Sequence, residues 1–364
     1  MGLGAIVVVA AGSESFESAG PRGAGRDCLL AEPLACVHVM GRSILERTIE
    51  RFVHAGVDIV SVVAAEEYSS AVLSLPVASD KVRVQAVANI SSAINQELQE
   101  YMRAGIEHTF VISANAYAET DLLDMFYFHR EARQTATRAL DREGPLDLWV
   151  VDCLKGQGQD LEKLQHGEQG GASYFIREYV NRVQQPADLR RLVSDALRGH
   201  CALRPSGLQV KPGIWIDEGA EVHRRARIVA PAYIGRGSKV KQDTLITRCS
   251  SIEAGCCIDY GTVIEDSSIL ANTHIGIWLD VCHAVAHGNK LLSLGRNVMV
   301  EIPDPGVMRF GVPVREEPSK LSLSSSSQQE YREHREQEEL VAEFAEQKSP
   351  RPDAWQFGTN LIQG

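Results

Sequence analysis

A six-residue repeat runs through residues 216–270 of the sequence. Every sixth residue of this stretch is a branched aliphatic: Ile216, Val222, Ile228, Ile234, Val240, Ile246, Ile252, Ile258, Ile264 and Leu270. The residue two positions before each of these, from the second onward, is small: Ala220, Ala226, Ala232, Ser238, Thr244, Ser250, Cys256, Thr262 and Ser268. A helix turns by 100° per residue and would spread these rows around its axis, whereas a strand places both on one face because six is a multiple of two.

Fixed six-residue spacing of this kind is typical of a left-handed parallel β-helix, in which each hexapeptide forms one side of a coil. We therefore predict such a coil over residues 208–303. After Leu270 the register moves by one residue, to Ile275 and Val281, which predicts a bulge or a short protruding loop.

Residues 5–152 alternate between strand-like and helix-like segments. We expect strands at 5–10, 58–64, 82–87, 108–113 and 146–152, and helices at 43–55, 91–104 and 120–132. Alternation of this type implies a parallel sheet covered by helices on both faces. The sequence therefore predicts a Rossmann-like α/β domain over residues 1–171.

The remaining segments are expected to connect or to extend these two domains. Two bridging helices, 172–183 and 187–198, are predicted within residues 172–207, the second directly after Pro186. Residues 304–364 are expected to form a flexible acidic tail with a serine-rich linker and one charged helix at 328–347. That helix is either solvated or the docking element for a protein partner.

Composition narrows the function classes. A net charge of −11 argues against nucleic acid as a partner. No apolar run approaches the ~20 residues that a membrane span needs, so we expect no membrane insertion and a cytoplasmic location. The 8 cysteines include no C-x-x-C pair, which favours reduced thiols over a disulfide framework and predicts no metal site.

Three stretches of the N-terminal region carry family-like motifs. They are Ala10-Ala11-Gly12 after the first strand, Glu32-Pro33-Leu34 with Met40-Gly41-Arg42-Ser43-Ile44-Leu45-Glu46, and 110–121 followed by His129. With the order of an α/β domain and a hexapeptide coil, they resemble the sugar-nucleotide pyrophosphorylases, a nucleotidyltransferase family that includes mannose-1-phosphate guanylyltransferases and bifunctional uridylyltransferase–acetyltransferases. The resemblance covers residues 5 to about 300.

In that family a sugar 1-phosphate attacks the α-phosphate of a nucleoside triphosphate and releases pyrophosphate. The reaction needs glycines beside the phosphates, cations, and a carboxylate that holds Mg²⁺. Here the corresponding positions are occupied by Glu14 for a glycine, Phe16 for an arginine, Glu32 for a lysine, and Ala114-Asn115 for a Gly-Asp pair. These departures remove or reverse charge, and a carboxamide is a poor replacement for a carboxylate on a hard cation.

The resemblance therefore implies a catalytically impaired homologue, a pseudoenzyme with a regulatory, sugar-nucleotide-binding or scaffold role in polysaccharide or cell-envelope precursor synthesis. It would bind a nucleotide or sugar nucleotide through Gly12, Ser13, Ser15 and Asn115, and form a homo-oligomer through the coil. Asp152 could correspond to a second acidic position of the family.

Two alternatives stay open at this level. In the first, the chain is an active, Mg²⁺-dependent nucleotidyltransferase in which Gly23-Ala24-Gly25 forms a displaced phosphate loop, with Arg22 and Arg26 as its cations. In the second, the coil is a hexapeptide acyltransferase whose general base is His283 or His287.

Overall fold

A computed structural model describes residues 2–10, 29–30, 32–73, 80–153 and 171–311 of the chain. Residues 1–314 form one compact unit. The serine-rich linker and the charged helix expected at 328–347 lie outside the described residues. None of the described helices combines the length and apolar character needed to cross a membrane.

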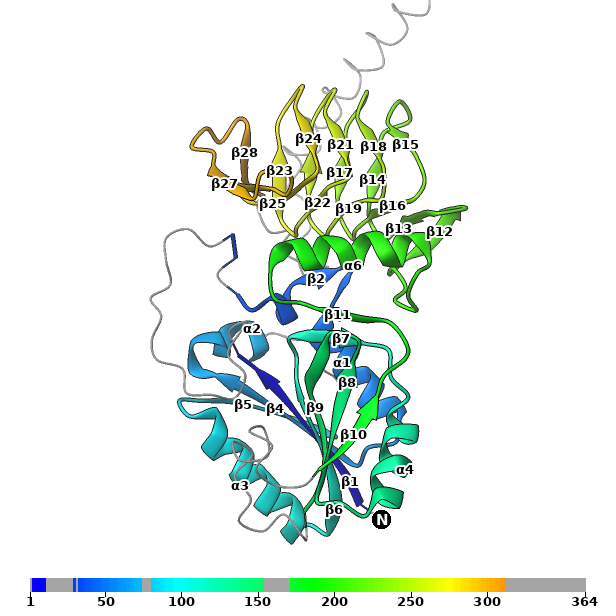
Figure 1. The fold of residues 1–364 in the computed structure, drawn as a ribbon. Coiled ribbons are helices and arrows are strands. Elements are labelled where there is room, and N and C mark those ends of the chain that lie inside the picture. Colours follow the sequence, from blue (N-terminus) through cyan, green and yellow to red (C-terminus); the bar gives the residue numbers. More distant parts are fainter. Residues whose placement is uncertain (1, 11–28, 31, 74–79, 154–170, 312–364) are drawn as a thin grey trace, which may run out of the picture. The chain divides into compact units, whose positions relative to one another are not determined.

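A seven-stranded sheet forms the centre of the N-terminal region, in the order β10-β8-β9-β6-β1-β4-β5 (Figure 1). Its strands are β1 (Gly2–Val9), β4 (Ile59–Ala65), β5 (Val82–Val87), β6 (Ile106–Ser113), β8 (Ala136–Asp141), β9 (Gly144–Asp152) and β10 (Ala172–Phe175). Strands β6, β1, β4 and β5 are mutually parallel, as predicted. The sheet as a whole is mixed, because β9 runs antiparallel to both β6 and β8.

The prediction of a wholly parallel sheet is therefore wrong at one strand, β9. The sequence reading missed β8, which forms a hairpin with β9. The Asp141 side chain closes the turn by accepting hydrogen bonds from the backbone N–H groups of Glu143 and Gly144. A tight turn of this kind can only join antiparallel strands, so it fixes the direction of β9.

The helices of this region match their predicted bounds to within two residues: α1 (Ile44–His54), α3 (Ile90–Arg103) and α4 (Leu122–Ala132). Three shorter helices are η1 (Leu34–Cys36), η2 (Glu66–Tyr68) and α2 (Ser69–Leu73). Alternate residues of β1 pack into different cores, Val7 with α1 and α4, and Ile6 with α3. Helices therefore cover both faces of the sheet, as the alternation predicted.

Only one of the two predicted bridging helices exists, α6 (Pro186–Arg198). Residues 172–183 instead contain β10, which extends the sheet beside β8, and β11 (Val180–Arg182), which pairs with β7 (Ala116–Ala118). The segment is rich in aromatic and β-branched residues, which favour strands, and pairing with β8 and β7 outweighs its helical spacing.

The C-terminal region is a three-sided coil of parallel strands. One sheet contains β13 (Ile214–Ile216), β16 (Ala232–Ile234), β19 (Ser250–Ile252), β22 (Ser268–Ile269) and β25 (Ala284–His287). The second contains β14 (Glu221–Val222), β17 (Lys239–Val240), β20 (Cys257–Ile258) and β23 (Thr273–Ile275). The third contains β15 (Arg227–Ile228), β18 (Leu245–Thr247), β21 (Val263–Glu265) and β24 (Asp280–Cys282).

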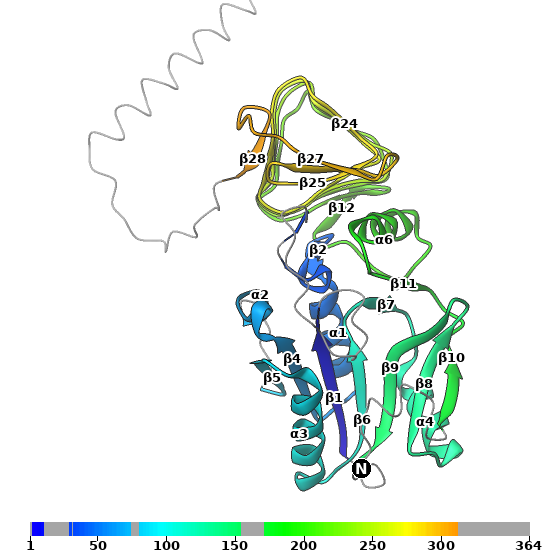
Figure 2. The same cartoon turned by 60° about the vertical axis from the view of Figure 1, so that its left-hand side comes forward.

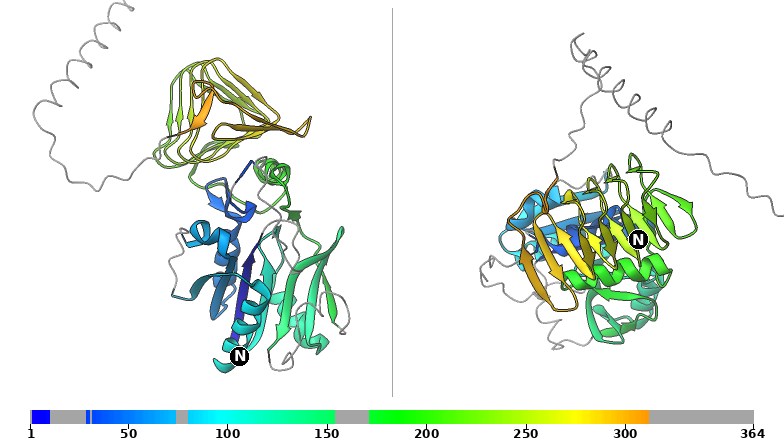
Figure 3. Two further views of the ribbon diagram at one scale, coloured as in Figure 1. Left: turned by 90° about the vertical axis from the view of Figure 1, so that its left-hand side faces the viewer. Right: turned by 90° about the horizontal axis from the view of Figure 1, so that it is seen from above.

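Figure 2 looks along this coil and shows its three sides, and Figure 3 shows its strands side by side in chain order. Ile216 pairs with Ile234 and Ile234 with Ile252, so one turn takes three hexapeptides. The predicted aliphatic row lines the core of the coil from Ile234 to Ile264.

The end of that row was placed wrongly. Ile269, not Leu270, pairs with Ile252 and lies in the coil core, whereas Leu270 packs in a different cluster. The small row shifts in the same way. The Ser267 hydroxyl accepts from the Ala284 N–H one turn later, as the Ser238 hydroxyl accepts from the Cys256 N–H. The Ser267 hydroxyl donates to the Glu265 carbonyl at 2.7 Å and also lies 3.2 Å from the Val281 carbonyl. The side between Ile264 and Ile269 is therefore one residue shorter than the others.

Antiparallel strands lie at both ends of the coil. β12 (Leu208–Lys211) pairs with β13 at one end. At the other end β26 (Lys290–Ser293) and β27 (Val298–Glu301) form a hairpin beside β25, and β28 (Met308–Phe310) pairs with β23. A further short pair, β2 (His38–Val39) and β3 (Arg42–Ser43), precedes α1. One hydrophobic cluster joins Met40 and Ile44 of this region to Leu192 of α6 and to Tyr233 and Val285 of the coil.

Candidate functional site

Asn115 lies at the carboxyl end of β6, at the edge where ligands bind in open α/β sheets. Its backbone carbonyl accepts a hydrogen bond from the Val183 N–H at 2.8 Å, and the preceding Ala114 donates to Val8 of β1. Asn115 is therefore close to the end of β1, where the sequence predicts the phosphate loop. Gly12, Ser13, Ser15, Arg22 and Arg26 lie outside the described residues, so their predicted roles stay predictions.

The charged groups at this edge of the sheet are either acidic or, like Arg51, already hydrogen-bonded to the backbone. Exposed Glu66 and Glu67 follow β4, the neighbour of β1. Arg51 of α1 donates to the backbone carbonyls of Ala118 and Thr120, and burial lowers its pKa. Two carboxylates near a triphosphate would repel it unless a cation lies between them.

The second acidic candidate, Asp152, lies at the opposite end of the sheet. It pairs with His108, near the start of β6, because β9 runs antiparallel to that strand. Five residue steps of strand separate His108 from Ser113, the last residue of β6 before Asn115, which is about 17 Å at ~3.3 Å per residue. Asp152 therefore cannot share a metal site with Asn115.

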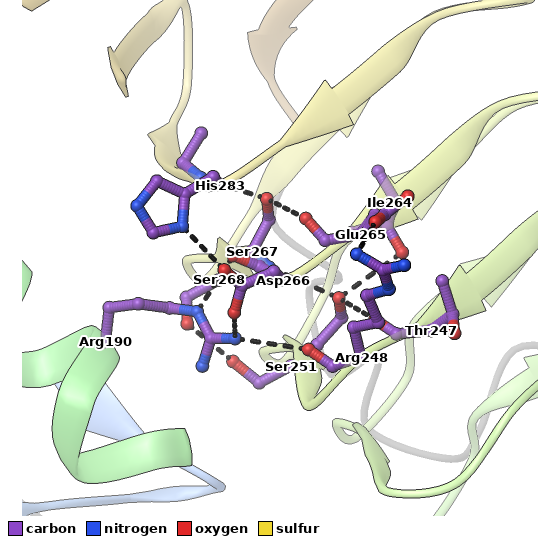
Figure 4. A network of polar contacts seen from close by, with 12 residues as sticks. Arg190, Thr247, Arg248, Ser251, Ile264, Glu265, Asp266, Ser267, Ser268 and His283 are labelled. Carbon is purple, nitrogen blue, oxygen red and sulfur yellow. Dashed lines mark hydrogen bonds and ion pairs between the residues drawn. The ribbon is translucent and has the colours of Figure 1, made fainter. Parts of the chain in front are cut away.

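The histidine His283 belongs to a polar network on the coil, shown in Figure 4. Its Nδ1 lies 2.5 Å from Asp266 Oδ2, and the other oxygen of Asp266 accepts from Arg190 Nη2 at 2.6 Å. A carboxylate only accepts, so Nδ1 carries a proton, and in the neutral imidazole Nε2 has the lone pair. Because the His283 side chain is 57% exposed, this lone pair can reach a ligand.

Arg190 ties this network to α6. Its Nε donates to the backbone carbonyl of Asp266, and its side chain is only 5% exposed. Burial lowers the pKa of Arg190, and the charge of Asp266 opposes that effect. Asp266 therefore joins helix and coil as well as orienting His283.

The other histidine, His287, packs against a neighbouring ring and is less accessible to a ligand. Its ring meets the Phe310 ring edge-on at 5.0 Å, and burial lowers its pKa. The charge of Glu32 acts on both Cys36, whose pKa is raised mainly by burial, and His287, whose pKa it raises against the larger effect of burial, so Glu32 lies near both residues. His287 Nδ1 lies 3.4 Å from the Leu29 carbonyl, so both predicted bases have a partner, but His283 is the one with a carboxylate partner and an exposed ring.

Glu253 is a buried carboxylate that the sequence reading did not single out. It is 1% exposed, and its two oxygens accept from the backbone N–H groups of Met40 at 2.8 Å and Gly41 at 3.0 Å. Burial raises the pKa of Glu253 to about 7, although these two hydrogen bonds and Arg47 lower it. Gly41 has φ +89°, and a Cβ there would lie 2.7 Å from the Tyr233 hydroxyl. Only glycine suits that position.

The structure also brings Cys257, Asp259 and His274 together on the coil. The sequence contained a signal for this contact, because the aliphatic row places Ile275 one turn after Ile258 and hence His274 beside Cys257. No C-x-x-C or His-x-His spacing marked the group.

The chain matches no protein-family model, and no curated protein is significantly similar to it in sequence.

Proposed function

We propose that this protein is a catalytically impaired relative of the sugar-nucleotide pyrophosphorylases. It would act as a regulatory, sugar-nucleotide-binding or scaffold subunit in polysaccharide or cell-envelope precursor synthesis. In this proposal the mixed α/β region is a nucleotidyltransferase-like domain, and the three-sided coil is a left-handed β-helix. The four parallel strands around β1 and the eighteen-residue pairing of the coil support it.

The observation that carries the proposal is the separation of Asn115 from Asp152 by the length of β6. Nucleotidyl transfer depends on Mg²⁺ held by carboxylates close to the phosphates. The carboxyl edge of the sheet offers the neutral amide of Asn115 at the family's ligand position, and the carboxylate of Asp152 lies at the other edge. Such a site retains shape and hydrogen bonds for a sugar nucleotide without the charge that drives turnover.

In this proposal the coil forms the contacts between copies of the chain in a homo-oligomer. Its inward positions are filled by aliphatic and small side chains, and outer surface away from the cluster with Met40 and Leu192 would contact copies of the chain. We propose a cytoplasmic homo-oligomer that binds neither nucleic acid nor membrane, with residues 304–364 as the contact for a protein partner.

Calorimetry with GTP, UTP, dTTP and their sugar nucleotides, with and without Mg²⁺, tests this function. We expect binding that does not depend on Mg²⁺ and no release of pyrophosphate. Asn115→Asp should make binding Mg²⁺-dependent, because it restores a carboxylate at the carboxyl edge. Asn297→Asp makes the same charge change at an exposed position of the coil and should alter nothing.

Two results would contradict the proposal. Steady pyrophosphate release by the wild-type protein that disappears in Arg26→Ala would establish the active, Mg²⁺-dependent alternative. Failure of every nucleotide and sugar nucleotide to bind would remove the sensing role.

One observation favours the acyltransferase alternative, the orientation of the exposed His283 by Asp266. A general base needs a free nitrogen within reach of the acceptor's proton, which this geometry offers. Turnover of acetyl-CoA that is lost in His283→Ala and retained in His287→Ala would establish that function. Without turnover, the network is a structural connection between α6 and the coil.

A further inference from the structure

We propose that the outer face of the coil carries a binding site for a zinc-type divalent cation, formed by Cys257, Asp259 and His274. The site is independent of the nucleotide-binding function proposed above, because it uses no residue of the α/β region.

The strand register brings these three side chains to one outward face. Cys257 in β20 pairs with His274 in β23, the next strand of the same sheet. Asp259 follows Cys257 by two residues, and alternation along a strand gives both the same face. Ile258 and Ile275, between and beside them, point into the core of the coil.

The donor atoms are almost at the spacing that a metal requires. His274 Nε2 lies 2.7 Å from Asp259 Oδ2, and Cys257 Sγ lies 3.7 Å from Asp259 Oδ1. One donor atom from each residue lies within 4.8 Å of the other two. Tetrahedral zinc with bonds of about 2.0–2.3 Å places its ligand atoms about 3.3–3.8 Å apart. Side-chain rotations alone can therefore close the donors around an ion.

The mixture of donors selects the class of metal. A thiolate, an imidazole and a carboxylate suit zinc and other borderline cations, whereas Mg²⁺ and Ca²⁺ prefer oxygen ligands alone. On binding, the Cys257 thiol loses its proton to solvent and its sulfur coordinates the ion. Three protein ligands leave the fourth tetrahedral position for water or for a group from a partner.

One nitrogen of the His274 ring lacks a hydrogen bond within the described residues. The His274 side chain is 7% exposed, and its Nδ1 is buried without a hydrogen-bond partner among the described residues. The cluster itself uses the other ring nitrogen, Nε2, so the grouping of the three donor atoms, and not the unpaired Nδ1, supports the site.

The charges around the cluster are compatible with a dication. Thiolate and carboxylate together supply two negative charges. Burial and the Asp259 carboxylate raise the pKa of the Cys257 thiol, and the nearby cations Lys241 and Arg309 oppose them in part. The Arg309 guanidinium is engaged with the Pro305 carbonyl at 2.7 Å, which holds it to its own loop.

Nucleophilic catalysis fits the same residues less well. A catalytic cysteine needs a base that accepts its proton. Here the thiol contacts Asp259, and the histidine lies on the far side of that carboxylate as its partner. Asp259 thus lies between the thiol and the imidazole, which suits three metal ligands better than a cysteine–histidine catalytic pair.

Metal titration of the full-length protein tests the site. Protein treated with a chelator is titrated with Zn²⁺ against a coloured competitor, and with Co²⁺ to follow thiolate-to-cobalt absorption. Cys257→Ser and His274→Gln remove ligands. Cys282→Ser is the matched control, because Cys282 is an exposed cysteine of the same coil outside the cluster.

We expect the wild-type protein and Cys282→Ser to bind one more equivalent of Zn²⁺ than Cys257→Ser. Losing a ligand should weaken binding by at least ~100-fold, since losing a residue that merely orients a ligand already costs ~10–100-fold. The cobalt–thiolate absorption should be absent in Cys257→Ser, and Zn²⁺ should raise the melting temperature only of the proteins with an intact cluster.

Equal Zn²⁺ stoichiometry in the wild-type protein and Cys257→Ser would overturn the proposal, as would an absence of Zn²⁺ binding. Cys257 is only partly buried, so the serine variant is expected to fold. Equal melting temperatures of the two metal-free proteins check this directly.

Discussion

The coil and the α/β region both contain parallel strands, but they specify them differently. In the coil each strand pairs with the one three hexapeptides later, and a hydroxyl such as that of Ser238 repeats the same contact with the next turn. In the α/β region β1 pairs with β4 and β6, which lie about 55 and 105 residues along the chain. A sequence repeat allows the strands to be predicted from local sequence. Residues that depart from the repeat are therefore candidates for a role other than forming the coil.

Two departures in the coil illustrate this. Glu253 is a charged residue directly after the inward Ile252, and it binds backbone amides far away in the sequence. Asp259 precedes the shortened side of the coil and His274 follows it, and the two side chains contact each other. In the α/β region, by contrast, candidate functional residues lie where strands end, as Asn115 does.

The largest effect is expected from a cavity in the coil. Ile258→Ala removes a wholly buried side chain and should lower the free energy of unfolding by about 2–5 kcal/mol. Urea unfolding measures this. Val298→Ala, at an exposed position of β27, is the control and should change stability by less than about 0.5 kcal/mol. Equal effects of the two variants would mean that the aliphatic row does not form the coil core.

The ionisation of Glu253 is expected to change the stability of the contact between the coil and the α/β region. Its folded pKa of about 7 exceeds the ordinary value of 4.5, so the folded state holds the proton more tightly. The stability from this group is present below pH 4.5 and is lost as pH rises to about 7. The loss is at most about 3 kcal/mol, and unfolding curves measured between pH 4.5 and 8 give it.

Glu253→Gln should remove this pH dependence, because glutamine does not titrate. Glu218→Gln, whose side chain is 77% exposed in the native protein, should keep it. The same pH slope in Glu253→Gln and the wild-type protein would show that the junction is insensitive to this carboxylate.

The position of the short turn can be tested with two neighbouring serines. Ser267→Ala leaves the buried Ala284 N–H without its acceptor and should cost about 1–3 kcal/mol. Within the described residues the Ser268 side chain has one hydrogen bond, accepted from the Ser251 hydroxyl at 3.1 Å, so Ser268→Ala should cost about 1 kcal/mol or less. Chemical denaturation compares them, and the reverse order would restore the unshifted register.

The smallest effect is expected at a local feature of the α/β region. The Ser43 hydroxyl accepts from the Glu46 N–H, and the Glu46 side chain accepts from the Ser43 N–H. Ser43→Ala should cost about 0.5–2 kcal/mol, while Ser43→Thr retains a hydroxyl acceptor and should cost less. Thermal unfolding distinguishes them, and equal losses would show that packing alone begins α1.

The sequence by itself determined the features that depend on local periodicity. The six-residue rows predicted the inward faces of the coil, and the 3.6-residue spacing with Ser43 as a cap predicted α1 to within one residue at each end. The resemblance pointed to Asn115, which lies at the carboxyl edge of the sheet. These features are readable because hydrophobic spacing and capping act over fewer than ten residues.

Only the tertiary structure decided which distant segments meet. In the structure β9 is antiparallel, and residues 172–183 contain strands where a helix was predicted. Ile269, not Leu270, is the inward residue, and Asp152 lies at the opposite end of the sheet from Asn115. The tertiary structure also placed Glu253 against Met40, 213 residues away. Such pairings depend on how whole elements pack, and no local pattern encodes the partner of a buried carboxylate or the direction of a strand.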